Sequence, residues 1–407
     1  MSEVVERFLR YAAIDTQSAE DAECFPSTDK QKSLARLLAA ELAEMGAADV
    51  YFDEDKCYVY AAIPATDGGK QPKVLGFISH MDTSPEVSGA NVKPQFWENY
   101  DGGEIVLSVE KGIVLSPEVF PELRGYIGKT LITTDGNTLL GADDKAGVAE
   151  IMTMAQELLS HPEIPHGRIA VAFTPDEEVG GGVDFFDLER FGADYAYTVD
   201  GGGIGELEYE NFNAASADVE IHGVSVHTGE AKNKMKNASY IAMEFDGMLP
   251  AKERPEYTEG YEGFFCLMSM SGDIENASLS YLIRDHDKAC FADRKALVER
   301  AALSLNNKYG EGTVTLSVRD SYYNMREKIE PFMFLVDNAK RAMESLGITP
   351  AVKPIRGGTD GARLSYMGLP CPNICTGGHN FHGRYEFVCA ESMEQIVKLL
   401  TLLACGE

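Results

Sequence analysis

Nearly continuous apolar runs alternate with amphipathic helical stripes in the first half of this chain. Strands that are buried on both faces of a covered sheet produce such runs. The runs lie at residues 74–79, 168–173 and 193–199, and the helical stripes lie within 1–20, at 30–46 and at 148–159. A strand pair is also expected within 49–63, whereas 83–140 favours irregular structure. The pattern predicts an α/β domain.

The pattern changes near Asn211, where small or polar residues begin to alternate with apolar ones. Strands are expected at 214–222, 264–272, 277–285 and 312–318, and helices at 237–249 and 294–307. A β-α-β-β-α-β order is that of a small ferredoxin-like α+β module with one helical layer.

The α/β pattern returns after Tyr323. The expected elements are a helix at 330–346, a strand at 351–354, a glycine-rich loop, a strand at 371–375 and a final helix at 392–404. The module is therefore expected to be an insertion. Residues 1–210 and 324–407 would form the two parts of a catalytic domain, and 211–323 would form the smaller domain.

Acidic and histidine motifs follow the three buried runs. His80 and Asp82 follow the first run. Glu177 and Glu178 follow the second run, and Asp200 follows the third. The carboxyl ends of neighbouring parallel strands meet at one edge of a sheet, where ligands gather. Since imidazoles and carboxylates together are the ligands of two-metal hydrolytic centres, we predict such a site at this edge.

The spacing of these residues indicates different tasks. Side chains two apart in an extended segment share a face, so Asp82 can accept the second ring proton of His80, as metal-bound histidines require. Glu177 and Glu178 are adjacent on a loop and point different ways. One can therefore bind metal while the other stays free as a general base.

Two further motifs leave alternatives open. Asp143 and Asp144 precede the helix at 148–159, and one aspartate at such a position is more often an N-cap. Two exceed what a cap needs, so we interpret Asp143 as a bridge between two cations and Asp144 as a cap or support. His382 could supply a second imidazole, but His379 lies three residues away and could compete with it.

The composition narrows the class of partner. A net charge of −29 disfavours nucleic acid and anionic membrane surfaces, and most of the acidity is expected to be solvated surface. We find no signal peptide and no stretch of roughly 20 apolar residues that could span a membrane.

The 8 cysteines lack paired spacing, except Cys371 and Cys375, which we assign to core packing. Reduced thiols favour a cytoplasmic protein.

Taken together, the motifs resemble those of the M20 family of zinc peptidases, in order and over the whole chain. They are His-Met-Asp-Thr at 80–83, Gly-Ala-Asp-Asp-Lys at 141–145, Pro-Asp-Glu-Glu at 175–178, Val-Asp-Gly-Gly at 199–202 and Asn-Phe-His-Gly at 380–383. Within the family the chain is most similar to the tripeptide aminopeptidases. The resemblance implies a zinc-dependent exopeptidase-like α/β domain, interrupted by a smaller domain that is often used for dimer contact, and thus a homodimer acting on small peptides.

The resemblance also implies a ligand set for two zinc ions. His80 and Asp200 would bind one ion, and Glu178 and His382 would bind the other. Asp143 would bridge the two ions.

Other roles are implied for residues that do not bind metal. Glu177 would be the general base and acid, and Asp82 would support His80. In the smaller domain, His227 would help to bind the substrate and polarise its carbonyl, often across the dimer. Arg284 would hold the substrate carboxylate.

The metal motifs do not separate a tripeptide aminopeptidase from a dipeptidase, an aminoacylase or a carboxypeptidase of the same family. Thr228 follows His227 where relatives carry proline, which leaves the details of substrate binding open. A catalytically silent binding protein with the same fold is a separate alternative. Loss of Glu177 or of a ligand would indicate it, and each of these residues is present.

Overall fold

The computed structural model describes residues 1–69 and 72–406. The chain divides into two compact units. The larger unit comprises Met1–Tyr209, Glu327–Lys353 and the chain from Thr359 to the C-terminal end, and the smaller comprises Glu210–Arg326 with Pro354–Gly358. Among the described residues, no helix combines the length and the apolar character needed to cross a membrane.

An eight-stranded sheet forms the centre of the larger unit. Its order is β1 (Ala48–Phe52), β2 (Val59–Ile63), β8 (Ile169–Thr174), β3 (Leu75–His80), β9 (Tyr195–Gly201), β16 (Asn373–Cys375), β10 (Glu206–Glu208) and β15 (Ala351–Val352). Strands β8, β3, β9 and β16 run parallel to one another. Every residue of β8 is buried, which explains its continuous apolar run.

Helices cover this sheet on both faces. Helix α3 (Ala142–Ser160) packs on β3 and β9, and α1 (Glu3–Ala12), α2 (Gln31–Met45) and α10 (Ala390–Cys405) pack around α3. Helix α8 (Phe334–Ser345) contacts α10, while α4 (Leu188–Phe191) and α9 (Asp360–Met367) contact strands of the same sheet. Gly147 permits the close approach of α3, because a Cβ there would lie 2.0 Å from the Val199 carbonyl oxygen.

Two stretches of the larger unit differ from the sequence-based expectation. The segment 83–140, expected to be irregular, contains β4 (Gln95–Trp97), β5 (Ile105–Ser108), β6 (Ile113–Leu115) and β7 (Leu131–Thr133). Strands this short give too few residues for an alternating pattern. The expected glycine-rich loop before residue 371 contains helix α9, whose N-cap Thr359 accepts the Gly361 N–H. Glycine inside a helix conceals its pattern.

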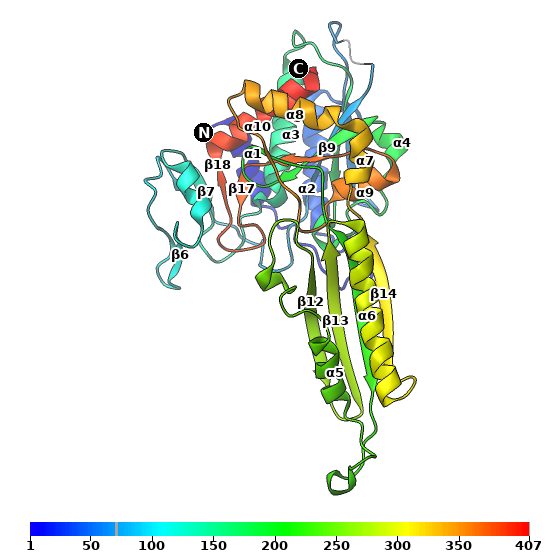
Figure 1. Ribbon diagram of the computed structural model, residues 1–407. Coiled ribbons are helices and arrows are strands. Elements are labelled where there is room, and N and C mark those ends of the chain that lie inside the picture. Colours follow the sequence, from blue (N-terminus) through cyan, green and yellow to red (C-terminus); the bar gives the residue numbers. More distant parts are fainter. Residues whose placement is uncertain (70–71, 407) are drawn as a thin grey trace. The chain divides into compact units, whose positions relative to one another are not determined.

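The smaller unit is an α+β module. Its sheet has the order β12 (Phe264–Gly272), β13 (Asn276–Asp285), β11 (Asn213–His222) and β14 (Val314–Tyr322), and every pair is antiparallel. Helices α5 (Ala238–Gly247) and α6 (Lys288–Tyr309) lie on one face of it (Figure 1). The predicted β-α-β-β-α-β order is confirmed. Helix α6 begins earlier than expected, because Asp287 caps it by accepting the N–H groups of Ala289 and Cys290.

Candidate metal centre

The ends of three neighbouring strands bring the sequence motifs together. His80 is the last residue of β3 and pairs in register with Thr174, the last residue of β8. On the other side of β3, Ile78 pairs with Thr198 of β9, so Asp200 lies level with His80. The loop with Glu177 and Glu178 leaves the end of β8 directly beside them.

His80 lies at the centre of this group and is 2% exposed. Its Nε2 atom lies 2.9 Å from Asp143 Oδ1 and 3.5 Å from Asp200 Oδ1. Its Nδ1 atom lies 3.1 Å from the Asp82 carbonyl oxygen and 3.3 Å from Asp82 Oδ1. Burial alone would lower the pKa of His80, but Asp200 and Asp143 raise it well above its usual value. Asp82 thus orients the ring from one side while carboxylates face the other.

A second group forms around His382. Its Nε2 atom lies 2.8 Å from Glu178 Oε2 and 3.2 Å from Asp143 Oδ2. Burial opposes the change, but these carboxylates raise the pKa of His382 to about 11. Burial and the charge of Asp143 raise the pKa of Glu178 to about 8. The two oxygens of Asp143 therefore face two different imidazoles.

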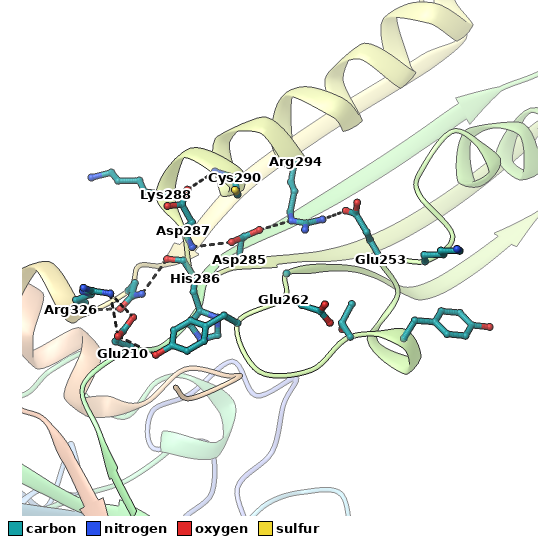
Figure 2. Close-up of a pocket in the computed structure, with 16 residues that line it drawn as sticks. Glu210, Glu253, Glu262, Asp285, His286, Asp287, Lys288, Cys290, Arg294 and Arg326 are labelled. Atoms are coloured by element: carbon teal, nitrogen blue, oxygen red, sulfur yellow. Dashed lines mark hydrogen bonds and ion pairs between the residues drawn. The ribbon is translucent and has the colours of Figure 1, made fainter. Parts of the chain in front are cut away.

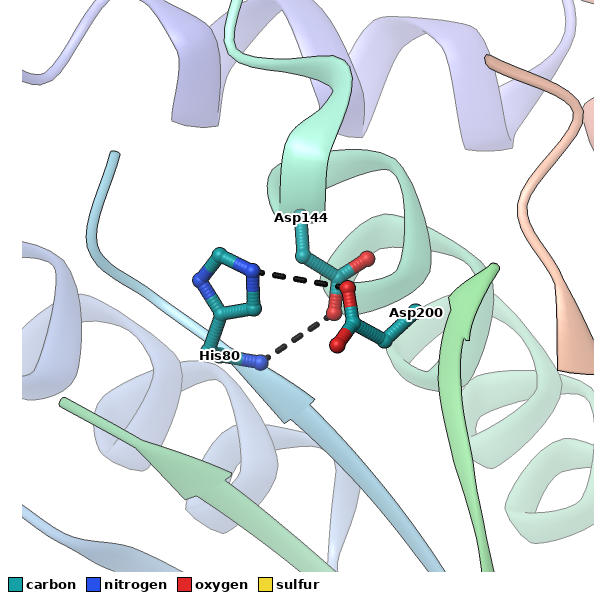
Figure 3. Close-up of side chains that lie close together, drawn as sticks. All are labelled: His80, Asp144 and Asp200. Carbon is teal, nitrogen blue, oxygen red and sulfur yellow. Dashed lines mark hydrogen bonds and ion pairs between the residues drawn. The ribbon is translucent and has the colours of Figure 1, made fainter. Parts of the chain in front are cut away.

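Asp144 does not cap helix α3. Gly141 precedes the helix without a side-chain cap, the chain kinks at Asp143 and Asp144, and Asp144 Oδ1 accepts no hydrogen bond from any described residue. Asp144 instead accepts the main-chain N–H of His80 at 3.1 Å. Figure 3 shows that His80, Asp144 and Asp200 converge, and each offers a ligand atom within 4.8 Å of the others. Asp144 therefore supports the cluster, and its capping alternative is wrong.

Glu177 and Glu178 lie in a single 3₁₀ turn, Glu177–Val179. Asp82 holds this turn, because its carboxylate accepts the N–H of Glu177 at 3.0 Å and that of Glu178 at 3.3 Å. Burial, and then the charge of Asp200, raise the pKa of Glu177 well above its usual value. No ion pair among the described residues involves Glu177, so its carboxylate is free to exchange a proton.

His379 does not belong to the cluster. It lies in the short strand β17 (Gly378–His379), where its Nε2 atom is 2.6 Å from the Tyr126 hydroxyl. Its ring stacks on Phe387 with the centroids 4.9 Å apart. Burial lowers the pKa of His379 to about 4. Of the two candidate histidines, only His382 contacts the carboxylates.

His227 and Arg284 both lie in the smaller unit. His227 is exposed, and its Nδ1 atom accepts the N–H of Gly229 at 3.2 Å. Arg284, on β13, donates to the Ala215 carbonyl oxygen at 3.4 Å and lies over the Tyr322 ring. The contacts described for His227 and Arg284 are thus with residues of the smaller unit. The histidine and carboxylate cluster lies in the larger unit.

Sequence reasoning missed two buried carboxylates near the cluster. Glu386 accepts the N–H groups of Leu140 at 2.6 Å, Gly141 at 2.9 Å and Asp143 at 3.0 Å, and so fixes the main chain that carries Asp143. Asp360 accepts the Thr174 hydroxyl at 2.8 Å, at the end of β8. Glu386 could have been found from its spacing, four residues after His382. Asp360 could have been found from the Gly-Gly-Thr sequence that precedes it.

A cavity of about 740 Å³ lies within the smaller unit (Figure 2). Its charged groups are largely paired with one another. Arg294 contacts Asp285 at 2.7 Å and also pairs with Glu253, and Arg326 lies 3.3 Å from Glu210. None of the described residues that line it is a predicted site residue. The chemistry indicated by the motifs therefore lies at the sheet edge of the larger unit.

The donor set at that edge fits divalent metal ions. Several carboxylates and two imidazoles converge there, and Glu178 Oε1 is buried with no hydrogen-bond partner among the described residues. Crowded, buried carboxylates are costly unless a cation compensates them. Nitrogen and oxygen donors of this kind suit zinc and related ions.

Comparisons with known proteins show what this chain is similar to. A family model described as a peptidase dimerisation domain matches residues 209–313. The peptidase T of Alkaliphilus oremlandii is 58% identical over 407 residues, which cover 99% of each chain. The peptidase T of Caldanaerobacter subterraneus is 58% identical over 400 residues, which cover 98% of this chain and 97% of that one.

Solved structures share the fold. An aminopeptidase PepT from Bacillus cereus has a TM-score of 0.77 at 23% identity, covering 99% of this chain and 97% of that one. A tripeptidase from Staphylococcus aureus has a TM-score of 0.78 at 20% identity, with the same coverage. A dinuclear metal-binding peptidase from Bacillus subtilis has a TM-score of 0.66 at 12% identity, covering 99% of this chain and 96% of that one.

Proposed function

This chain belongs to the peptidase T family of M20 peptidases, and on that premise we propose that it is a cytoplasmic two-zinc aminopeptidase that removes the N-terminal residue of tripeptides. One observation carries the proposal: Asp143 faces His80 with one oxygen and His382 with the other. A carboxylate so placed suits a bridge between two ions. The full-length similarity to peptidase T proteins supports the choice of tripeptides.

The residues that would hold zinc divide into two sets. His80 and Asp200 would hold one ion, Glu178 and His382 the other, and Asp143 both. When bound, such a pair polarises the scissile carbonyl and makes a water molecule acidic near neutral pH.

Glu177 is the proposed general base and acid. It takes the proton of the attacking water and returns it to the leaving amine, a task for a carboxylate that is not itself held by a cation. Asp82 serves both parts of the site, because it accepts the N–H groups of Glu177 and Glu178 and also contacts the His80 ring. It therefore fixes the base relative to the ligand histidine.

The smaller unit supplies the proposed substrate contacts. His227 donates to the oxyanion that forms from the scissile carbonyl, a role worth about 2.7–4 kcal/mol for one donor. Arg284 binds the C-terminal carboxylate of the tripeptide, which suits the fork of a guanidinium group.

A homodimer is the proposed assembly. Strand β12 is an edge of its sheet, and Leu267, Met268 and Met270 on it are 38%, 59% and 41% exposed. On α5, which contacts β12, Tyr240 is 70% and Met243 59% exposed. An unpaired edge beside exposed apolar side chains fits an interface with a second copy.

The cytoplasmic assignment rests on the 8 cysteines, since the part of the chain that the structure describes contains no disulfide. Free thiols persist in reducing compartments.

The test is a substrate panel with the zinc-loaded protein. We expect release of a free N-terminal residue from tripeptides and no release from the same tripeptides after N-acetylation, because a recognised amine would be blocked. Preferred cleavage of dipeptides, acylated amino acids or C-terminal residues would favour another M20 activity. A zinc-loaded sample inert to the whole panel would favour a silent binding protein.

A further inference from the structure

Hydrogen bonds to two separate parts of the chain hold the turn that carries Glu177 and Glu178. On one side it donates two main-chain N–H groups to Asp82. On the other side lies Asp176, the residue just before Glu177, which is 2% exposed and has a positive φ of 54°. The Asp176 carbonyl oxygen accepts the N–H of Gly181 at 2.8 Å and so closes the loop.

The Asp176 carboxylate is bound by a segment far away in sequence. It accepts the Ser27 N–H at 2.6 Å, the Ser27 hydroxyl at 2.5 Å and the Gln31 side-chain amide at 2.6 Å. The Gln31 amide oxygen in turn accepts the Asp176 N–H at 3.1 Å. Gln31 is fully buried, and its amide meets both the main chain and the side chain of Asp176. We call Asp176, Ser27 and Gln31 the Asp176 anchor.

The same segment is also attached to the other half of the site. Ser18 donates its N–H and its hydroxyl to the Thr83 carbonyl oxygen, each at 3.1 Å, and Thr83 directly follows Asp82. Within the segment, Ala19 donates its N–H to the Ser27 hydroxyl at 3.0 Å. Residues 18–31 therefore connect the chain beside Asp82 to the residue before Glu177.

We propose that the Asp176 anchor is a positioning device for the general base. It fixes the main chain at Asp176, and Asp82 fixes the main chain at Glu177, so the Glu177 carboxylate has a single placement beside the ligands. This inference rests on the proposed function in one respect, namely that Glu177 is the base. A displacement of about 1 Å at such a group can cost a hundredfold in rate.

The chemistry of the anchor permits a test by exchange of the two partners. Asp176→Asn places an amide against the amide of Gln31, and Gln31→Glu places a carboxylate against the carboxylate of Asp176. Each single change opposes like groups. The double variant Asp176→Asn/Gln31→Glu restores one carboxylate facing one amide, with the carboxylate on the other residue.

We expect each single variant to lower kcat by at least about tenfold with KM changed by less than about twofold, and with metal content unaltered. The double variant should recover kcat to within about threefold of the parent protein. Thermal unfolding of all three variants separates misplacement of the base from general loss of fold. The proposal would be overturned if the double variant, folded and metal-loaded, had a kcat no higher than that of the less active single variant.

A second measurement does not depend on catalysis. Hydrogen exchange of the amides in 176–182 should be faster in each single variant and return to the parent rate in the double variant. Unchanged exchange in the single variants would also overturn the proposal. If Glu177→Gln kept full activity, the proposed function would fail, and this measurement would still decide whether the anchor holds the loop.

A matched control and a milder variant complete the design. Asp194 is a carboxylate just before β9 that accepts the Val74 N–H at 2.8 Å and pairs with Lys73, far from the motifs in the sheet. Asp194→Asn should leave kcat unchanged. If Asp176→Asn fails to fold, Ser27→Ala removes one hydroxyl donor and should lower kcat by a smaller factor in the same direction.

Discussion

Asp143 lies 2.9 Å from His80, measured between Oδ1 and Nε2, although 63 residues separate them in the chain. The second oxygen of Asp143 lies 3.2 Å from His382 Nε2, across 239 residues. The Asp143 carboxylate therefore contacts both histidines, whereas each histidine belongs to only one of the two proposed ligand sets. Because of this difference, metal analysis can separate the proposed role of Asp143 from those of the histidines.

Replacing Asp143 should affect both metal ions, whereas replacing either histidine should affect one. We expect Asp143→Ala to reduce bound zinc from about two ions to less than one, and His80→Ala and His382→Ala to leave about one each. Elemental analysis of folded, dialysed protein measures the ratio. His379→Ala is the matched control and should keep both ions, since its Nε2 atom contacts Tyr126. Full zinc content in Asp143→Ala would contradict the bridge.

Glu177 should be needed for turnover and not for metal binding. Glu177→Gln keeps the shape of the side chain but removes its basicity, so we expect kcat to fall by about 10² to 10⁴ with zinc retained. Glu178→Gln is the matched neighbour and should lose zinc as well as activity. Steady-state kinetics and elemental analysis on the same samples compare them. Loss of zinc in Glu177→Gln would make Glu177 a ligand instead of the base.

Much of this arrangement could be predicted from sequence because it depends on periodicity. Buried strands give continuous apolar runs, and the rule that parallel strands end at one edge placed His80 and Asp200 together. Glu386 escaped this reasoning, because its three main-chain donors lie 243 to 246 residues away and follow no period. The residues themselves left His379 and His382 both open, and only the family resemblance favoured His382. Packing on Phe387 and a bond to Tyr126 separate them, and both are tertiary contacts.

His227 should act on the active site of the partner subunit. We expect His227→Ala and Glu177→Ala each to be nearly inactive, with zinc content unchanged. When the two variants are mixed and allowed to exchange subunits, a mixed dimer carries one complete site if His227 acts across the dimer. Random exchange would then recover about one quarter of the parent activity.

The mixing experiment distinguishes the two possible arrangements. If His227 acts within its own subunit, every site in the mixture lacks one of the two residues and activity stays near zero. Two different affinity tags, one on each variant, allow mixed dimers to be isolated and serve as the control for subunit exchange. Near-normal turnover of His227→Ala alone would contradict any catalytic role for this residue.

A charge on strand β12 should separate the proposed dimer. Met268 is 59% exposed on this edge strand, and Met268→Asp would bury a carboxylate in the interface. We expect a monomer by sedimentation analysis, with activity lost because His227 no longer reaches a partner. Val109, 87% exposed in the larger unit, gives the control Val109→Asp, which should stay dimeric. A dimeric Met268→Asp would place the interface elsewhere.

Glu150 should make the stability of the fold depend on pH. It is fully buried in α3, and neither carboxylate oxygen has a hydrogen-bond partner among residues 1–69 and 72–406. Burial raises the pKa of Glu150 well above its usual value, so the folded protein keeps this proton where the unfolded chain has released it. Because the folded state binds the extra proton, stability falls as pH rises from about 4.3 towards the folded-state pKa.

Glu150→Gln removes this titration and keeps the shape of the side chain. The variant and the parent protein should have similar stability near pH 4, where both side chains are neutral. Above that pH the variant should become more stable, by up to about 1.4 kcal/mol for each pH unit until the folded-state pKa is passed. Denaturant unfolding at several pH values measures the difference. The control Glu157→Gln, on the same helix but partly exposed and bonded to Thr401, should show no such trend. A pH-independent difference for Glu150→Gln would mean that this carboxylate is ionised in the folded protein and has found a compensating partner.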